Sequence, residues 1–173
     1  MSEIQDAARE HARRVLTEYG VVNAPVPVEK IIKKRNIRIQ FSPLDKELSG
    51  MALVKDGVAL IGVNALHHPN RQRFTMAHEL GHHVIHRQHI EGTMHVDKGF
   101  TILLRDPLAA QGTDRLEIEA NAFASELLMP KDLLEPFIDA GNIDLDDVDR
   151  LQMVAKKFKV SLSALQYRLL AFS

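Results

Sequence analysis

The stretch MAHELGHHVIH, residues 76–86, decides the fold of this 173-residue chain. Apolar residues at helical spacing lie on both sides of it and predict an amphipathic helix whose N-cap is Asn70. Within this helix His78, Glu79 and His82 form the pattern H-E-x-x-H. Side chains at i and i+4 share one helix face, so both imidazoles can bind one cation at about 2.0–2.1 Å. The sequence therefore predicts a metal site on this helix.

Glu79 has a different expected role from the two histidines beside it. It is offset around the helix and can act on a water molecule instead of binding the metal. When Zn²⁺ binds a water molecule, the pKa of that water falls toward about 7, so a carboxylate can take its proton near neutral pH. Glu79 is therefore the expected general base.

The other histidines do not supply an obvious third ligand. His86 lies on the same face as His78 but eight residues later, which at 1.5 Å per residue places the two about 12 Å apart. We expect His86 to support a ligand or the fold. His89 is the loop histidine worth testing, but the metzincin pattern needs glycine and histidine where this chain has Ile85 and Gln88. No ligand role is assigned to His67, His68, His83 and His95.

A second helical segment, residues 114–130, offers a carboxylate ligand. Glu117 and Asn121 share a helix face, so Glu117 could bind the metal while Asn121 hydrogen-bonds a ligand. Glu119 lies about 200° around the helix from Glu117, so only one of the two glutamates can serve. Asp114 and Glu117 also fit a capping box, in which Glu117 would only close the helix start. The residues alone leave both glutamates open.

Composition narrows the class of protein. Hydrophobic residues make up 45% and charged residues 26%, the formal net charge is −1, and there is no cysteine. These values indicate a globular chain without disulfides or thiolate metal sites, and without the strong basic field of a nucleic-acid binder. No apolar run resembles a signal peptide or a membrane span. We expect a cytoplasmic protein with no membrane partner.

The remaining patterns predict an α+β fold. Apolar spacing and turn residues predict, in chain order, a helix over 3–19, a short helix from Pro27, a strand over 36–42, a hairpin over 48–64 that turns at Asp56-Gly57, an irregular region over 89–114 with a possible strand at 100–105, and short helices over 132–141, 145–158 and 160–172.

The C-terminal segment, residues 148–172, has the spacing of a helix-turn-helix between Ala155 and Leu165. A DNA-reading helix needs basic side chains for phosphates and polar side chains aimed at base edges. Here only Arg168, Gln166 and a few hydroxyls are available. We therefore expect a packing or partner-docking element and no direct DNA binding.

Two motifs carry a family resemblance. The pattern R-x-R-F-T-x-A-H-E-L-G-H over 71–82 resembles the core motif of the ImmA/IrrE-type metallopeptidases. The pattern E-x-E-A-N-x-F-A over 117–124, followed by E-L-L-M-P over 126–130, resembles their second motif. The resemblance covers roughly residues 5–130.

The resemblance implies a zincin-like fold, in which a small, mostly antiparallel sheet packs on the H-E-x-x-H helix and a second helix brings a glutamate. In that family the ligand glutamate lies four residues before the asparagine, which selects Glu117 over Glu119. It implies a metallopeptidase domain over 1–130. Residues 131–173 would form a helical extension packed on this domain, not an independent domain.

The resemblance also implies the function: a zinc endopeptidase that cleaves an XRE/Cro-type repressor and thereby relieves repression. One Zn²⁺ would be held by His78, His82 and Glu117, with water as fourth ligand and Glu79 as general base; this N/O ligand set would accept other divalent ions. A non-cleaving module that sequesters the repressor is the alternative.

Two parts of such a reaction are left open by the residues. The substrate is expected to add as a strand to an exposed sheet edge, formed by residues 57–63 or 100–105. No tyrosine or histidine is placed by motif to stabilise the oxyanion, since Tyr19 and Tyr167 are far from the motif in sequence and His86 is only a guess.

Overall fold

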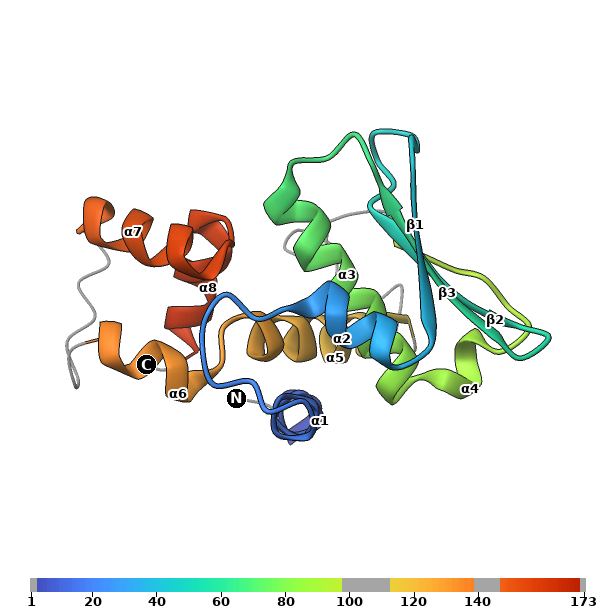
Figure 1. Ribbon diagram of the computed structural model, residues 1–173, viewed down its shortest axis with the longest axis horizontal. Coiled ribbons are helices and arrows are strands. Elements are labelled where there is room, and N and C mark those ends of the chain that lie inside the picture. Colours follow the sequence, from blue (N-terminus) through green and yellow to red (C-terminus); the bar gives the residue numbers. More distant parts are fainter. Residues whose placement is uncertain (1–2, 98–112, 139–146, 172–173) are drawn as a thin grey trace.

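The computed structural model describes residues 3–97, 113–138 and 147–171 (Figure 1). Its elements, in chain order, are α1 (Glu3–Glu18), α2 (Val28–Lys34), β1 (Ile37–Ser42), β2 (Gly50–Lys55), β3 (Val58–Asn64), α3 (Pro69–Ile85), α4 (Arg87–Ile90), β4 (His95–Asp97), α5 (Thr113–Leu128), α6 (Lys131–Leu134), η2 (Glu135–Phe137), α7 (Val148–Phe158) and α8 (Leu162–Leu170). The expected α+β fold, with one small sheet and many helices, is confirmed.

The four strands form one sheet in the order β1-β3-β2-β4. β2 is antiparallel to both β3 and β4, whereas β1 and β3 are parallel. The predicted hairpin is confirmed: β2 and β3 are joined by Asp56 and Gly57, whose φ angles are 50° and 76°. Two consecutive positive φ angles characterise the type I′ turn, whose twist matches that of the flanking strands.

One expectation about the sheet is wrong. Residues 57–63 do not form an exposed edge, because β3 pairs with β1 on one side and β2 on the other. The other proposed edge, residues 100–105, lies outside the described residues. Among the described strands, the outer ones are β1 and β4.

The helix α3 lies between the sheet and α5 (Figure 1). It approaches α5 at Gly81, where a Cβ atom would lie 3.1 Å from Cδ1 of Phe123 and 3.3 Å from Cα of Ala120. Contacts this short are tighter than ordinary side-chain packing. Glycine at 81 and alanine at 120 therefore set the separation of the two helices that carry the expected metal ligands.

The start of α3 differs from the expectation. His68, not Asn70, is the N-cap, and its ring accepts a hydrogen bond from the Asn70 backbone N–H. Pro69 follows at the first helical position, which suits its fixed φ and missing N–H. The Asn70 side chain instead donates to the Val160 carbonyl at 3.0 Å, so it ties α3 to the connection between α7 and α8.

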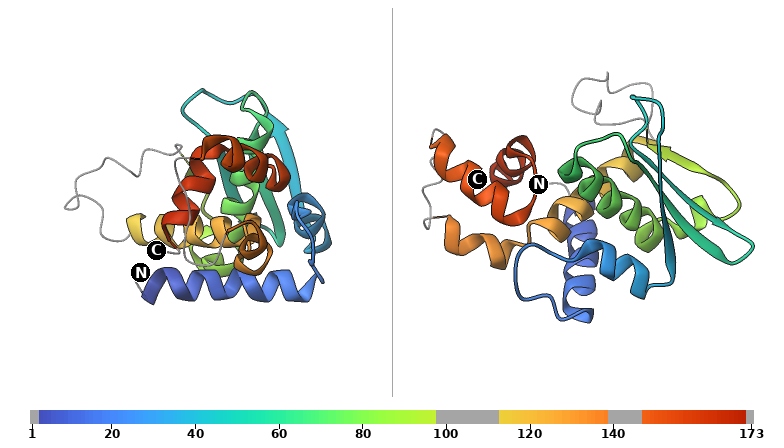
Figure 2. Two further views of the ribbon diagram at one scale, coloured as in Figure 1. Left: turned by 90° about the vertical axis from the view of Figure 1, so that its left-hand side faces the viewer. Right: turned by 45° about the horizontal axis from the view of Figure 1, so that its top comes forward.

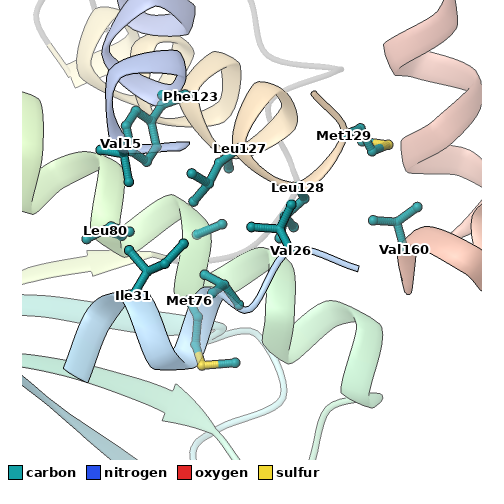
Figure 3. Packing of buried hydrophobic residues seen from close by; sticks show 14 of the residues in the cluster. Val15, Val26, Ile31, Met76, Leu80, Phe123, Leu127, Leu128, Met129 and Val160 are labelled. Atoms are coloured by element: carbon teal, nitrogen blue, oxygen red, sulfur yellow. The ribbon is translucent and has the colours of Figure 1, made fainter. Parts of the chain in front are cut away.

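The core is built where α1, α2, α3 and α5 meet (Figure 3). The apolar faces of these helices supply side chains that are almost fully withdrawn from solvent. Labelled in the figure are Val15, Ile31, Met76, Leu80, Phe123 and Leu127. None of the described helices is long and apolar enough to cross a membrane.

The helices α7 and α8 lie at the end of the molecule opposite the sheet (Figures 1 and 2). Arg168 of α8 is buried, donates to the Met129 carbonyl at 3.1 Å and pairs with the buried carboxylate of Glu126. Glu126 also accepts from Arg13 of α1 at 3.2 Å. The main cation of the expected recognition helix thus points into the protein.

Replacing Gly50 tests the contact between β2 and α3. A Cβ there would lie 2.4 Å from Cγ2 of Thr75 and 2.9 Å from the Gly62 carbonyl oxygen, which is backbone and cannot rotate away. We expect Gly50→Ala to lower the free energy of unfolding by about 1–3 kcal/mol, as overpacking does. Urea denaturation measures this, with the exposed Lys55→Ala as control, for which a change within about 0.5 kcal/mol is expected.

Replacing Arg168 tests how the C-terminal helices are held. Arg168→Met would leave the buried Glu126 with partners that include Arg13 and the Lys131 backbone N–H, and we expect the free energy of unfolding to fall by about 3 kcal/mol, the lower end for breaking a buried pair. Adding Glu126→Met should recover part of that loss in urea denaturation. Equal stability of wild type and Arg168→Met would contradict the importance of the pair.

Candidate metal centre

The helices α3 and α5 bring three expected ligands together. Nε2 of His78 and Nε2 of His82 lie 3.1 Å apart. Glu117 faces both of them, with Oε2 at 3.2 Å from Nε2 of His78 and Oε1 at 3.4 Å from Nε2 of His82. The two histidines are buried and Glu117 is nearly so, so these polar atoms converge in an environment with little water.

A fourth donor comes from β4, and sequence reasoning missed it. Nε2 of His95 lies 2.9 Å from Oε1 of Glu117, and its ring centroid is 3.9 Å from that of His82. One donor atom each from His78, His82, His95 and Glu117 lie within 4.8 Å of one another. The only local signal was the alternation His95-Val96-Asp97, which is too short to predict a strand.

These separations fit a tetrahedral cation. Ligand distances of about 2.0–2.1 Å place neighbouring donor atoms of a tetrahedron about 3.3–3.4 Å apart. Oε1 of Glu117 and Nε2 of His95 are close and buried, yet neither has a hydrogen-bond partner among the described residues. In the Nδ1-protonated tautomer of His95, Nε2 is a lone pair that faces the carboxylate oxygen, and two such atoms fit a shared cation. The group could therefore hold a divalent metal ion.

The other ring nitrogen of His78 is oriented by α5. Nδ1 lies 3.0 Å from Oδ1 of Asn121, so the ring N–H donates to the amide oxygen. With the proton on Nδ1, the lone pair of Nε2 is directed to the candidate centre. Asn121 thus makes the contact that its spacing from Glu117 suggested.

A chain of polar contacts orients His82 in the same way. Arg115 donates to Glu119 at 3.0 Å, Glu119 lies 2.6 Å from Nε2 of His86, and Nδ1 of His86 lies 3.1 Å from Nδ1 of His82. The carboxylate assigns the proton of His86 to Nε2, so Nδ1 of His86 accepts from Nδ1–H of His82. Nε2 of His82 is then a free lone pair. Glu119 and His86 therefore orient the ligand His82 and do not bind the metal themselves.

Glu79 is completely buried beside the ligand group. Both of its carboxylate oxygens lack a hydrogen-bond partner among the described residues. One of them lies within 4.8 Å of donor atoms of His78 and Asp97. Gly50 makes room for it, since a Cβ there would lie 3.2 Å from Oε1 of Glu79. An unpaired buried carboxylate is costly and marks a functional site.

Burial and charge shift the pKa values of these groups. Burial raises the pKa of Glu79 to about 8, and the charges of Asp97 and Glu117 act in the same direction. Burial lowers the pKa of His82 to about 3, so this ring is neutral and free to donate a lone pair. Ligand groups must be deprotonated to bind a metal, and His82 meets that condition at neutral pH.

Glu117 and His78 form the charged pair of the site. Burial opposes ionisation of Glu117, but the imidazoles of His78, His82 and His95 outweigh it and hold the pKa well below its usual range. Burial likewise opposes the charge on His78, but Glu117, Glu79 and Asp97 raise its pKa to about 9. A cation bound here would replace the proton on His78.

The remaining histidines and the two tyrosines lie away from the donor group. His83 contacts the Leu60 carbonyl at 3.0 Å and so ties α3 to the sheet. His89 is exposed on α4. Tyr19 contacts the cations of Lys34 and Arg35, and Tyr167 is exposed on α8.

Comparisons with known proteins agree with this geometry. Residues 32–170 match the family Peptidase M78, described as an IrrE N-terminal-like domain. A search of curated proteins gave no match. Among solved structures, a Mycobacterium tuberculosis transcriptional regulator is similar with a TM-score of 0.58 and 18% identity, covering 98% of this chain and 46% of the regulator. The likeness is one of fold, and the chain spans about half the length of that regulator.

The zinc content of two variants distinguishes the role of Glu117 from that of Glu119, the two glutamates of α5 near the site. We expect wild type to bind one zinc ion per chain and Glu117→Ala to lose it, because that substitution removes a donor atom. Glu119→Ala removes no donor atom but breaks the chain from Arg115 to His86, so the zinc affinity of this variant should fall by about 10- to 100-fold. Elemental mass spectrometry and chelator competition measure both, with the exposed Glu135→Ala as control. Equal zinc content in all four proteins would contradict the assignment.

Proposed function

Since the chain belongs to the Peptidase M78 family, we propose that it is a zinc-dependent endopeptidase whose substrate is an XRE/Cro-type helix-turn-helix repressor in the cytoplasm. The observation that carries the proposal is Glu79, a buried carboxylate next to a set of metal donors and without a hydrogen-bond partner in the part of the chain that the structure describes. A purely structural metal site has no use for such a group.

The proposal gives each residue of the site a task. His78, His82 and Glu117 would hold the ion, and Asn121, His86 and Glu119 would keep the two rings in the tautomer that binds it. A divalent ion there supplies a Lewis acid that polarises the scissile carbonyl and makes water a stronger acid.

Glu79 would move the protons of the reaction. A carboxylate in this position takes a proton from the attacking water and delivers it to the leaving amine. Burial raises the pKa of Glu79, whereas a cation held by the neighbouring ligands would favour its ionised form, which is the form that accepts a proton. The carbon–nitrogen bond then breaks, and the amine leaves with that proton.

The choice of substrate rests on the family resemblance and on the edge of the sheet. Among the described strands β4 is an outer strand, and its residue His95 lies in the donor group. An extended peptide that pairs with this edge would pass close to the metal. The burial of Arg168 supports the view that the chain acts on a repressor and does not itself read DNA.

A second function has one observation in its favour. Four protein donors close a tetrahedron, as in structural zinc sites. A module of that kind could relieve repression by sequestering the repressor without cutting it. The two functions differ in what happens to the repressor chain.

Glu79→Gln distinguishes the two functions. We expect the variant to keep its zinc and its binding to the repressor, but to cleave it about 10²–10⁴-fold more slowly, the usual contribution of a general acid–base group. The assay follows fragments of a purified Cro-type repressor by mass spectrometry. Release of intact repressor from operator DNA by both wild type and Glu79→Gln would favour sequestration.

A further inference from the structure

His95 occupies a position that the proposed reaction requires to be open. A catalytic zinc site has three protein ligands and keeps the fourth position for water or substrate. Here Nε2 of His95 lies with the donor atoms of the other three ligands and faces Oε1 of Glu117 at 2.9 Å. A metal held by all four would be closed to water and to a peptide carbonyl.

We propose that His95 is a displaceable fourth ligand, which closes the metal site at rest and leaves it when substrate enters. The entry of a peptide rests on the proposed function, whereas the ligation by His95 does not. The exchange replaces one neutral donor by another, so the charge of the site does not change.

The first argument is the unequal support of the three imidazoles. His78 is oriented by Asn121 and His82 by His86. In both rings the contact is made by Nδ1, the nitrogen that does not face the candidate centre. No comparable hydrogen bond orients the ring of His95 within the described part of the chain; its neighbours there are Glu117 and the ring of His82. A ligand without such support is the one that a competing donor displaces first.

The second argument is the position of β4 in the fold. The other three ligands come from α3 and α5, which pack tightly at Gly81. β4 has three residues, and within the described part of the chain they pair with Gly50–Ala52 of β2, with one further backbone hydrogen bond from Ser49 to the Asp97 carbonyl at 3.0 Å. The His95 side chain is 18% exposed, against 4% for His78 and 1% for His82. His95 is therefore the ligand on the solvent side, where a substrate would approach.

The test combines zinc affinity with the binding of acetohydroxamate, a small chelator that needs open coordination positions. His95→Ala should bind zinc about tenfold or more weakly. In wild type, His95 would close the site in about 90% or more of the molecules, which lowers the apparent affinity for acetohydroxamate about tenfold or more. The Co²⁺ form of His95→Ala should therefore bind acetohydroxamate about tenfold or more tightly than the Co²⁺ form of wild type. His11→Ala on α1 is the matched control and should change neither value.

His95→Cys provides a readout that a merely structural histidine would not give. The chain has no cysteine, so a cobalt–thiolate charge-transfer band in this variant reports ligation from position 95. The inference is overturned if His95→Ala matches wild type in both zinc and acetohydroxamate affinity and His95→Cys shows no band. Circular dichroism of each variant verifies that the fold is intact.

The same samples separate this inference from the proposed function. In one outcome, His95→Ala shows both the weaker zinc binding and the tighter acetohydroxamate binding while neither it nor wild type cleaves a repressor. In that case the peptidase function fails and the ligand assignment holds. If wild type cleaves the repressor while both affinities are unchanged in His95→Ala, the function holds and the ligand assignment fails.

Discussion

The close approach of α3 and α5 is the constraint on which the site depends. Donor atoms on two helices can share one small cation only if their backbones come near, because His and Glu side chains have fixed reach. Gly81 allows this, since a Cβ there would crowd Cα of Ala120 at 3.3 Å. Gly81 precedes the ligand His82, and Ala120 precedes Asn121. The small residues of the two motifs thus matter to the metal as much as the polar ones.

Burying a polar group costs free energy unless the group has hydrogen-bond partners. In this site the ligand histidines have such partners, whereas Glu79 does not among the described residues. The outer nitrogens of His78 and His82 both have partners, from Asn121 and from His86 with Glu119 behind it. Glu79 has no such partner among the described residues. The supported groups are those that hold the ion, and the unsupported carboxylate is the one assigned to proton transfer.

The C-terminal helices are joined to the same framework. Arg168 reaches Glu126 at the end of α5, and Asn70 at the start of α3 donates to the Val160 carbonyl. These contacts support, as a proposal, the view that residues 131–173 form an extension packed on the metallopeptidase domain. They also explain why a helix-turn-helix spacing need not imply DNA binding, since Arg168, the cation of the helix that would read bases, is used inside the protein.

The sequence alone determined the elements with local signals: the helix that carries His78 and His82, the helix that carries Glu117, and the hairpin at Asp56-Gly57. Helical spacing and turn chemistry are properties of neighbouring residues. Only the tertiary structure decided that β3 is internal, that Glu119 reaches His86 across 33 residues, and that His95 joins the donor group. The physical reason is that strand order and contacts across long sequence separations depend on how whole elements pack, for which a three-residue strand carries no local pattern.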